Sequence, residues 1–172
     1  MNHQKHKYLR TLAIAPSTYG FGFAVMDGFD TLADWGMKGA DGEKNKVVLK
    51  KVKELMNRYQ PELLVIPNTE AANSRRSTRI KKLTRKIKEL GQSNGAKVIA
   101  YTLEEMHSAF SDGKKGTKHD IAIKLGERFP DELGKRVPPK RKLWQSEDSR
   151  MDIFEAVALA LMPRLRGRKV TS

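Results

Sequence analysis

A dense run of arginine and lysine side chains lies between positions 73 and 97 of the chain. Its basic members are Arg75, Arg76, Arg79, Lys81, Lys82, Arg85, Lys86 and Lys88, and Glu89 is the only acid among them. A guanidinium group presents a planar fork of N–H donors that matches phosphate oxygens, whereas lysine adds a point charge. A helix of nearly one sign favours contact with a nucleic-acid backbone over a merely solvated face. The chemistry that this run predicts is phosphate binding.

A second basic group precedes the last predicted helix. Its members are Lys135, Arg136, Lys140, Arg141 and Lys142, and Trp144 follows two residues later. Aromatic rings stack on the bases of single-stranded nucleic acid, which makes Trp144 a candidate base contact. The alternative interpretation is that Trp144 is a packing anchor beside the start of the helix.

The segment 113–118, Gly-Lys-Lys-Gly-Thr-Lys, places lysines and backbone amides just before another predicted helix. Such a helix N-terminus favours a phosphate contact, with Lys118 as its candidate side chain. The spacing is not that of a P-loop, so ATP binding is excluded. The predicted nucleic-acid contacts are Arg75, Arg76, Arg79, Lys82, Lys118, Arg141 and Trp144.

Three acidic residues stand near the other end of the chain. Asp152 and Glu155 are three positions apart, so they share one face of the predicted last helix, and Asp148 lies one turn earlier on that face. If the helix begins later, Glu147 and Asp148 become acids that favour its dipole. Glu155 sits inside an apolar run, where burial of a carboxylate is costly without a partner.

Composition bounds the class of protein. The chain has 172 residues, which predicts one domain over 1–172 with a short basic arm at 1–7 and a basic tail at 164–172. The formal net charge of +14 and the pI near 10.0 favour a polyanionic partner. The absence of cysteine excludes disulfides and thiolate metal sites.

The remaining patterns indicate a cytoplasmic protein with no membrane partner. The longest apolar stretch, 153–162, is interrupted by Glu155 and is too short to cross a bilayer. Neither a signal-peptide core nor a basic amphipathic helix with large apolar residues is evident.

Hydrophobic periodicity gives the elements that must position these side chains. Strands are predicted at 8–14, 21–26, 31–37, 62–66 and 97–101, and helices at about 47–59, 80–93, 103–110, 117–129 and 149–165, with 130–142 irregular. The order is βββ-α-β-α-β followed by helices. It predicts an α/β fold with a five-stranded mixed sheet flanked by helices.

Two segments carry a family resemblance. The run from Leu12 to Val25, LAIAPSTYGFGFAV, resembles the first hairpin of RuvC-type Holliday-junction resolvases. The run from Met151 to Ala160, MDIFEAVALA, resembles the last helix of the same family. The resemblance implies a ribonuclease H-like fold and hydrolysis of phosphodiesters by Mg²⁺ or Mn²⁺ held between carboxylates.

In that family the carboxylates come from the end of the first strand, the end of the fourth strand and the last helix. Ala15 stands where the pattern has Asp, and Pro67 stands where it has Glu. Asp152 and Glu155 remain as the implied metal ligands, and with Asp148 they are the remnant catalytic acids. Substitute oxygens near the fourth strand would come from Asn68, Thr69 and Glu70.

Three hypotheses follow. The preferred one is a RuvC-like protein that binds branched or structured DNA with impaired metal-dependent cleavage. The second is an active Mg²⁺-dependent endonuclease that uses Asp148, Asp152 and Glu155 with a substitute such as Glu70. The third is a basic accessory protein of RNA. DNA is the expected partner ahead of RNA, and a homodimer is an expected assembly because resolvases dimerise.

Overall fold

The computed structural model describes residues 9–111 and 116–170 of the chain, and for residues 167–170 it describes the backbone alone. The predicted N-terminal arm at 1–7 and the first part of the 113–118 loop lie outside the described residues. Within the described part, no helix is long and apolar enough to cross a membrane.

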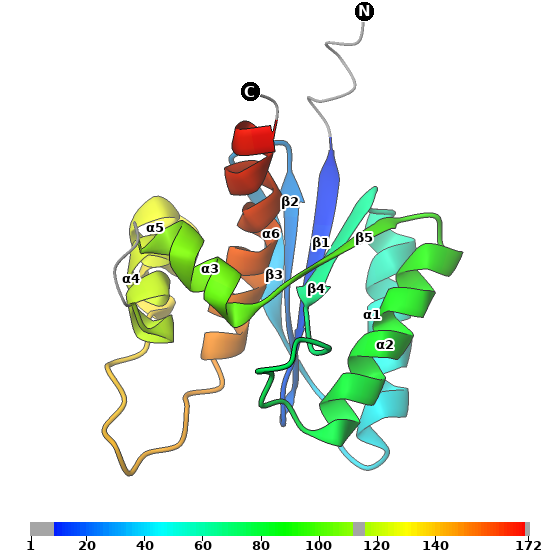
Figure 1. Ribbon diagram of the computed structural model, residues 1–172, viewed down its shortest axis with the longest axis horizontal. Helices are drawn as coiled ribbons and strands as arrows, with labels where there is room; N and C mark the ends of the chain where they lie inside the picture. The colour runs from blue at the N-terminus through cyan, green and yellow to red at the C-terminus, as the bar shows by residue number, and fades with distance from the viewer. Residues whose placement is uncertain (1–8, 112–115, 171–172) are drawn as a thin grey trace, which may run out of the picture.

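Five strands form one mixed sheet (Figure 1). They are β1 (Arg10–Pro16), β2 (Gly20–Asp27), β3 (Thr31–Gly39), β4 (Leu63–Pro67) and β5 (Lys97–Tyr101), in the order β3-β2-β1-β4-β5. The pairs β1–β2 and β2–β3 are antiparallel, whereas β1–β4 and β4–β5 are parallel. The predicted α/β fold with a five-stranded mixed sheet is therefore confirmed.

Helices cover both faces of the sheet (Figure 1). The crossover helices α1 (Lys44–Tyr59) and α2 (Thr78–Ser93) pack on one face. The last helix, α6 (Met151–Val170), packs on the other. Beyond α6 lie α3 (Leu103–Phe110), α4 (Lys118–Arg128) and α5 (Pro130–Leu133). The parallel strands need these crossovers because one strand finishes at the opposite end of the sheet from where the next strand starts.

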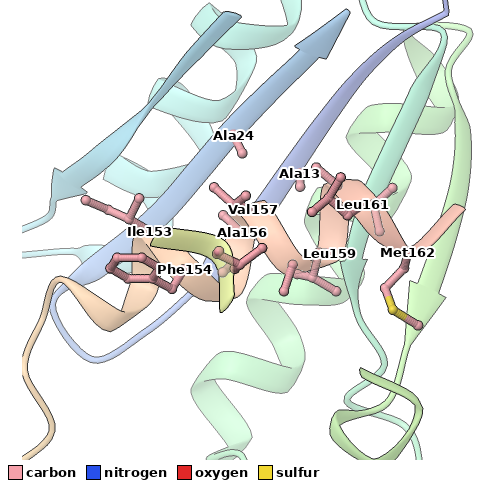
Figure 2. Packing of buried hydrophobic residues seen from close by; sticks show 14 of the residues in the cluster. Ala13, Ala24, Ile153, Phe154, Ala156, Val157, Leu159, Leu161 and Met162 are labelled. Atoms are coloured by element: carbon pink, nitrogen blue, oxygen red, sulfur yellow. The ribbon is translucent and has the colours of Figure 1, made fainter. Parts of the chain in front are cut away.

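The α6 helix is buried around its whole circumference between residues 156 and 162. It lies between the sheet and α3 and α4, which accounts for its lack of a polar face. Figure 2 shows Val157 and Leu161 lying against the small strand residues Ala24 and Ala13. Small side chains on the strands let the helix approach the sheet closely.

Gly22 brings the start of α6 even closer to the sheet. A Cβ atom at Gly22 would lie 2.0 Å from the backbone oxygen of Asp152, a distance that no side chain tolerates. Gly22 pairs with Ala15 across β1 and β2. The glycine therefore sets Asp152 beside the end of the first strand.

Two predictions about irregular segments are wrong. The segment 130–142 contains α5 and a 3₁₀ turn over Gly134–Arg136. The basic tail predicted from 164 is part of α6, and Arg164 is only 7% exposed. The Arg164 guanidinium donates to the backbone oxygens of Gly28 at 2.5 Å and Ala160 at 2.7 Å. Buried carbonyls thus satisfy a charge that the sequence pattern assigns to solvent.

Candidate nucleic-acid interface

The four positions that the resemblance singles out meet at one end of the sheet. Parallel pairing joins Ala13 to Val65, so the same register, continued two residues, sets Ala15 beside Pro67. Both are buried. Asp152 contacts Ser17, directly after β1, and Glu155 lines a hollow with Pro67. We call this end of the sheet, with the first turns of α6, the carboxylate pole.

Asp152 is a partly buried acid with a raised pKa. Burial, with smaller contributions from the nearby Glu155 and Glu147, raises the pKa of Asp152 to about 6, while a hydrogen bond from Ser17 and the charge of Arg76 oppose the shift. The Ser17 hydroxyl donates to Asp152 Oδ2 at 2.5 Å.

Glu155 has the partner that its burial requires. The Arg76 guanidinium donates to Glu155 Oε1, and the two side chains are 27% and 10% exposed respectively. Arg76 also donates to the backbone oxygen of Pro16 at 3.1 Å. It comes from the loop before α2, immediately ahead of the N-cap Ser77. A guanidinium therefore bridges the end of β1 and the last helix.

Asp148 does not share the helix face of Asp152 and Glu155, because α6 begins at Met151. Its carboxylate accepts hydrogen bonds from Arg150 N at 2.9 Å and from Arg150 Nη2 at 2.7 Å. These bonds and the charge of Arg150 lower the pKa of Asp148. The prediction of one continuous acidic face is wrong, since the chain turns before the helix starts.

The substitute oxygens near β4 have local partners. Glu70 is exposed and accepts a hydrogen bond from Arg85 Nη2 at 3.1 Å, and the contact with Arg85 lowers its pKa. The Asn68 side-chain oxygen accepts from the backbone N–H of Glu70 at 3.1 Å. These contacts join neither side chain to Glu155 or Asp152.

The residues at the carboxylate pole do not fit a pair of divalent cations. Such a centre needs several hard oxygen ligands from neighbouring elements. Here the strand positions are Ala15 and Pro67, the Glu155 carboxylate is paired with Arg76, and the Asp152 carboxylate accepts a hydrogen bond from Ser17. Among residues 9–111 and 116–170, no group of three or more His, Asp or Glu side chains is close enough to hold a metal ion.

A cleft lined by both basic and acidic side chains crosses the carboxylate pole. Its acidic members are Glu104, Glu147, Asp148, Asp152 and Glu155. Two hollows of about 600 and 450 Å³ share Arg75, Arg76, Lys118 and Glu155 in their linings. A third hollow of about 250 Å³ shares Lys118 with them and adds Lys140 and Arg141. The cleft combines segments from five places in the chain: the end of β1, the segment between β4 and α2, the end of β5 with the start of α3, the start of α4, and the segment before α6.

The predicted nucleic-acid contacts divide into two groups. Arg75, Arg76, Lys118 and Arg141 line the cleft. Arg79 is turned inward, donating to Asn45 Oδ1 at 2.9 Å and to the Ser17 backbone oxygen at 3.3 Å. Lys82 is exposed on α2 and lines none of the three hollows.

Trp144 lies on the strap, residues 138–150, which joins the 3₁₀ turn to α6 (Figure 1). Its side chain is 79% exposed, and the neighbouring Leu143 is fully exposed. The Lys142 ammonium lies 5.4 Å from the centre of the Trp144 ring system. Trp144 is therefore not a packing anchor, and the strap presents an apolar pair between basic and polar neighbours.

No protein-family profile matches the chain, and no curated protein sequence matches it. Similar solved structures include RuvC from Thermus thermophilus, at 18% identity and a TM-score of 0.66, covering 94% of this chain and 97% of RuvC. The same protein in complex with a Holliday junction substrate gives 17% identity and a TM-score of 0.67, covering 95% and 98%. The yeast mitochondrial Holliday junction resolvase Ydc2 gives 9% identity and a TM-score of 0.61, covering 96% and 82%.

These likenesses extend over nearly the whole chain and define its fold class. The protein has the ribonuclease H-like fold of RuvC, as the sequence resemblance implies. At such low identity, the shared property is the fold.

Proposed function

We propose that the protein binds branched or structured DNA of the Holliday-junction kind in the cleft, and that its metal-dependent cleavage is impaired. The observation that carries this proposal is the cleft itself: Arg75, Arg76 and Lys118 line both larger hollows at the pole where the resolvase resemblance puts the cutting centre. Arginine and lysine side chains grip phosphates irrespective of base sequence.

Two further observations support a nucleic-acid ligand. The net charge of +14 supplies long-range attraction for a polyanion. The similar fold of RuvC was solved with a Holliday junction substrate, which shows that this scaffold accommodates such DNA in that protein. Together they favour DNA with a branch as the ligand.

Impaired cleavage is supported by the residues of the carboxylate pole. Ala15 and Pro67 occupy two of the four positions where acids are expected, and the carboxylate at a third, Glu155, is paired with Arg76. The active-endonuclease alternative relies on Glu70, whose carboxylate pairs with Arg85 instead.

A binding and nicking assay on matched substrates tests the proposal. The panel holds a four-way DNA junction, a linear duplex made from the same strands, and an RNA hairpin, each with EDTA, Mg²⁺ or Mn²⁺. We expect the junction to be bound most tightly under all three conditions, with no metal-dependent nicking.

Each other outcome identifies a competing hypothesis. Tighter binding of RNA without a preference for the junction would support the RNA accessory protein. Nicking that needs Mg²⁺ or Mn²⁺ and is lost in Glu155→Gln would establish the active endonuclease, because that substitution keeps the shape of the side chain and removes its charge.

A further inference from the structure

We propose that Arg76 is the resident cation of the carboxylate pole: its guanidinium takes the place of a divalent metal ion and forms a metal-free site for a backbone phosphate. The phosphate half of this inference rests on the proposed function. The metal half stands on the geometry of the chain alone and is tested separately.

The position of Arg76 is the first argument. Its guanidinium joins two of the three elements from which the family's metal ligands come, through the Pro16 carbonyl at 3.1 Å and the Glu155 carboxylate. It also lines the same hollow as Pro67, the residue at the third element. A positive group therefore lies between the end of β1, the end of β4 and α6.

Charge balance is the second argument. Glu155 is only 10% exposed, and a buried carboxylate needs a counter-charge with good hydrogen-bond geometry. Because Ala15 and Pro67 provide no ligands, a metal ion would have few oxygens to hold it in place. The Arg76 guanidinium, which is part of the chain, neutralises Glu155 without any further oxygen ligands.

The unused donors of Arg76 are the third argument. A guanidinium has five N–H donors, of which the contacts with Pro16 and Glu155 use two. The side chain is 27% exposed and lines both larger hollows. Arg75 and Lys118 line the same two hollows. The remaining edge of Arg76 can therefore bind one phosphodiester oxygen with help from these neighbours.

The metal half is tested by restoring a carboxylate with and without Arg76. We would compare Ala15→Asp, Ala15→Asp with Arg76→Gln, and Ala15→Asp with Arg76→Lys, measuring Mn²⁺ binding by electron paramagnetic resonance. The Gln combination should bind Mn²⁺ at least about tenfold more tightly than Ala15→Asp alone, because removal of a neighbouring positive charge favours a divalent cation. The Lys combination keeps the charge and should stay weak.

Ala15→Asp with Lys44→Gln is the matched control. Lys44 donates to the Thr18 backbone oxygen at 2.8 Å, so its replacement removes one positive charge near the same pole without touching Glu155. Thermal melts confirm that each variant is folded before its Mn²⁺ affinity is compared. Equal Mn²⁺ affinity with Arg76 and with Gln at that position would overturn the inference.

The phosphate half is tested in a background without the Glu155 charge, so that no buried carboxylate is left without its partner. Glu155→Gln is compared with Glu155→Gln plus Arg76→Gln for binding of the four-way junction at constant ionic strength. Arg76→Gln should weaken binding several-fold. In a salt titration it should also lower the log–log slope by about 0.9, the value for one duplex phosphate that is no longer neutralised.

The outcomes separate this inference from the proposed function. If the unaltered protein binds no nucleic acid, the proposed function fails, while the Mn²⁺ comparison still decides the role of Arg76 as a cation. If the junction binds equally well with and without Arg76 in the Glu155→Gln background, the phosphate site is wrong although the proposed function survives.

Discussion

Asp152 lies under the close contact between Gly22 and α6, with one hydroxyl donor from Ser17. Burial is the largest reason why its pKa rises to about 6 from an ordinary value near 3.8. The folded state therefore holds a proton more tightly than the unfolded state. The contribution of Asp152 to stability therefore falls as the pH rises from about 4 to 6 and the native carboxyl group ionises.

Asp152→Asn should remove this pH dependence. The variant keeps a side chain of the same shape without a buried charge, so at pH 8 its free energy of unfolding should be higher by at most about 3 kcal/mol. Below about pH 4 the two proteins should agree. Urea denaturation across this pH range measures the difference.

Asp148→Asn is the opposite control. Hydrogen bonds from Arg150 lower the pKa of Asp148, so its charge stabilises the fold above its unfolded pKa and this contribution disappears as the pH falls. Its removal should lower stability at pH 8 slightly. If Asp152→Asn behaved in the same way, Asp152 would be an ordinary stabilising carboxylate.

The sequence predicts which residues meet at the pole but not how they pair. Strand ends and helical spacing are enough to bring Ala15, Pro67, Asp152 and Glu155 together, because parallel strands end at one edge of a sheet. The expense of burying Glu155 also predicts a partner. Its identity depends on the path of the loop before α2, and eight basic residues in that region compete equally in the sequence.

At the scale of elements, the contact between β2 and α6 fixes the pole. Gly22→Ala would put a Cβ atom 2.0 Å from the Asp152 backbone oxygen, and backbone cannot yield as a flexible side chain can. We expect the free energy of unfolding, measured by urea denaturation, to fall by about 1–3 kcal/mol or more. Binding of junction DNA in the cleft should weaken as well, because the start of α6 must move.

Gly39→Ala provides the comparison within the same sheet. A Cβ atom at Gly39 would meet its nearest neighbour, the Tyr19 backbone oxygen, at 3.8 Å, which is ordinary contact. Its stability should stay within about 0.5 kcal/mol of the unaltered protein. Similar destabilisation at both glycines would show that the effect belongs to glycine in strands rather than to helix approach.

The strap is the second element with a testable role. Leu143 and Trp144 are exposed beside Lys142, an arrangement suited to stacking on bases that a branch leaves unpaired or partly unstacked. Trp144→Ala should therefore weaken junction binding by about 1–3 kcal/mol and affect the linear duplex much less. Gel shifts with both substrates measure this change in preference.

Fluorescence gives an independent measure of the strap. The chain has two tryptophans, so Trp35→Phe leaves Trp144 as the sole reporter. Addition of junction DNA should quench it if the ring stacks on a base. An unchanged spectrum at saturating DNA, with normal binding, would remove Trp144 from the interface.

Elements with strong periodicity are predictable, and the exceptions share a cause. The strand at Lys97–Tyr101 and the helix at Leu103–Phe110 have the predicted bounds. The burial of Arg164 in α6 does not follow from the sequence pattern, because arginine ordinarily lies at the surface. Arg164 is buried only because the fold brings the carbonyls of Gly28 and Ala160 to its guanidinium, which local sequence does not show.

At the scale of the whole molecule, the net charge and the cleft predict different ways of binding DNA. A net charge of +14 attracts any polyanion from any direction, whereas the cleft holds only some of the basic side chains, at one end of the sheet and beside acidic ones. Several basic side chains of α2 lie outside it or are already engaged, as Arg79 and Arg85 show. Binding through the cleft therefore depends on where the charges lie as well as on their number.

Two triple variants with the same net charge distinguish binding through the cleft from binding through overall charge. One replaces the cleft residues Arg75, Lys118 and Arg141 with Gln, and the other replaces Lys50, Lys53 and Arg58, which are exposed on α1, with Gln. Both lower the net charge by three. The cleft triple should reduce the log–log salt slope of junction binding by about 0.9 for each duplex phosphate that is no longer neutralised, whereas the α1 triple should leave the slope almost unchanged. Equal effects would mean that the protein binds DNA through its overall charge, since only a local interface responds to the position of the charges removed.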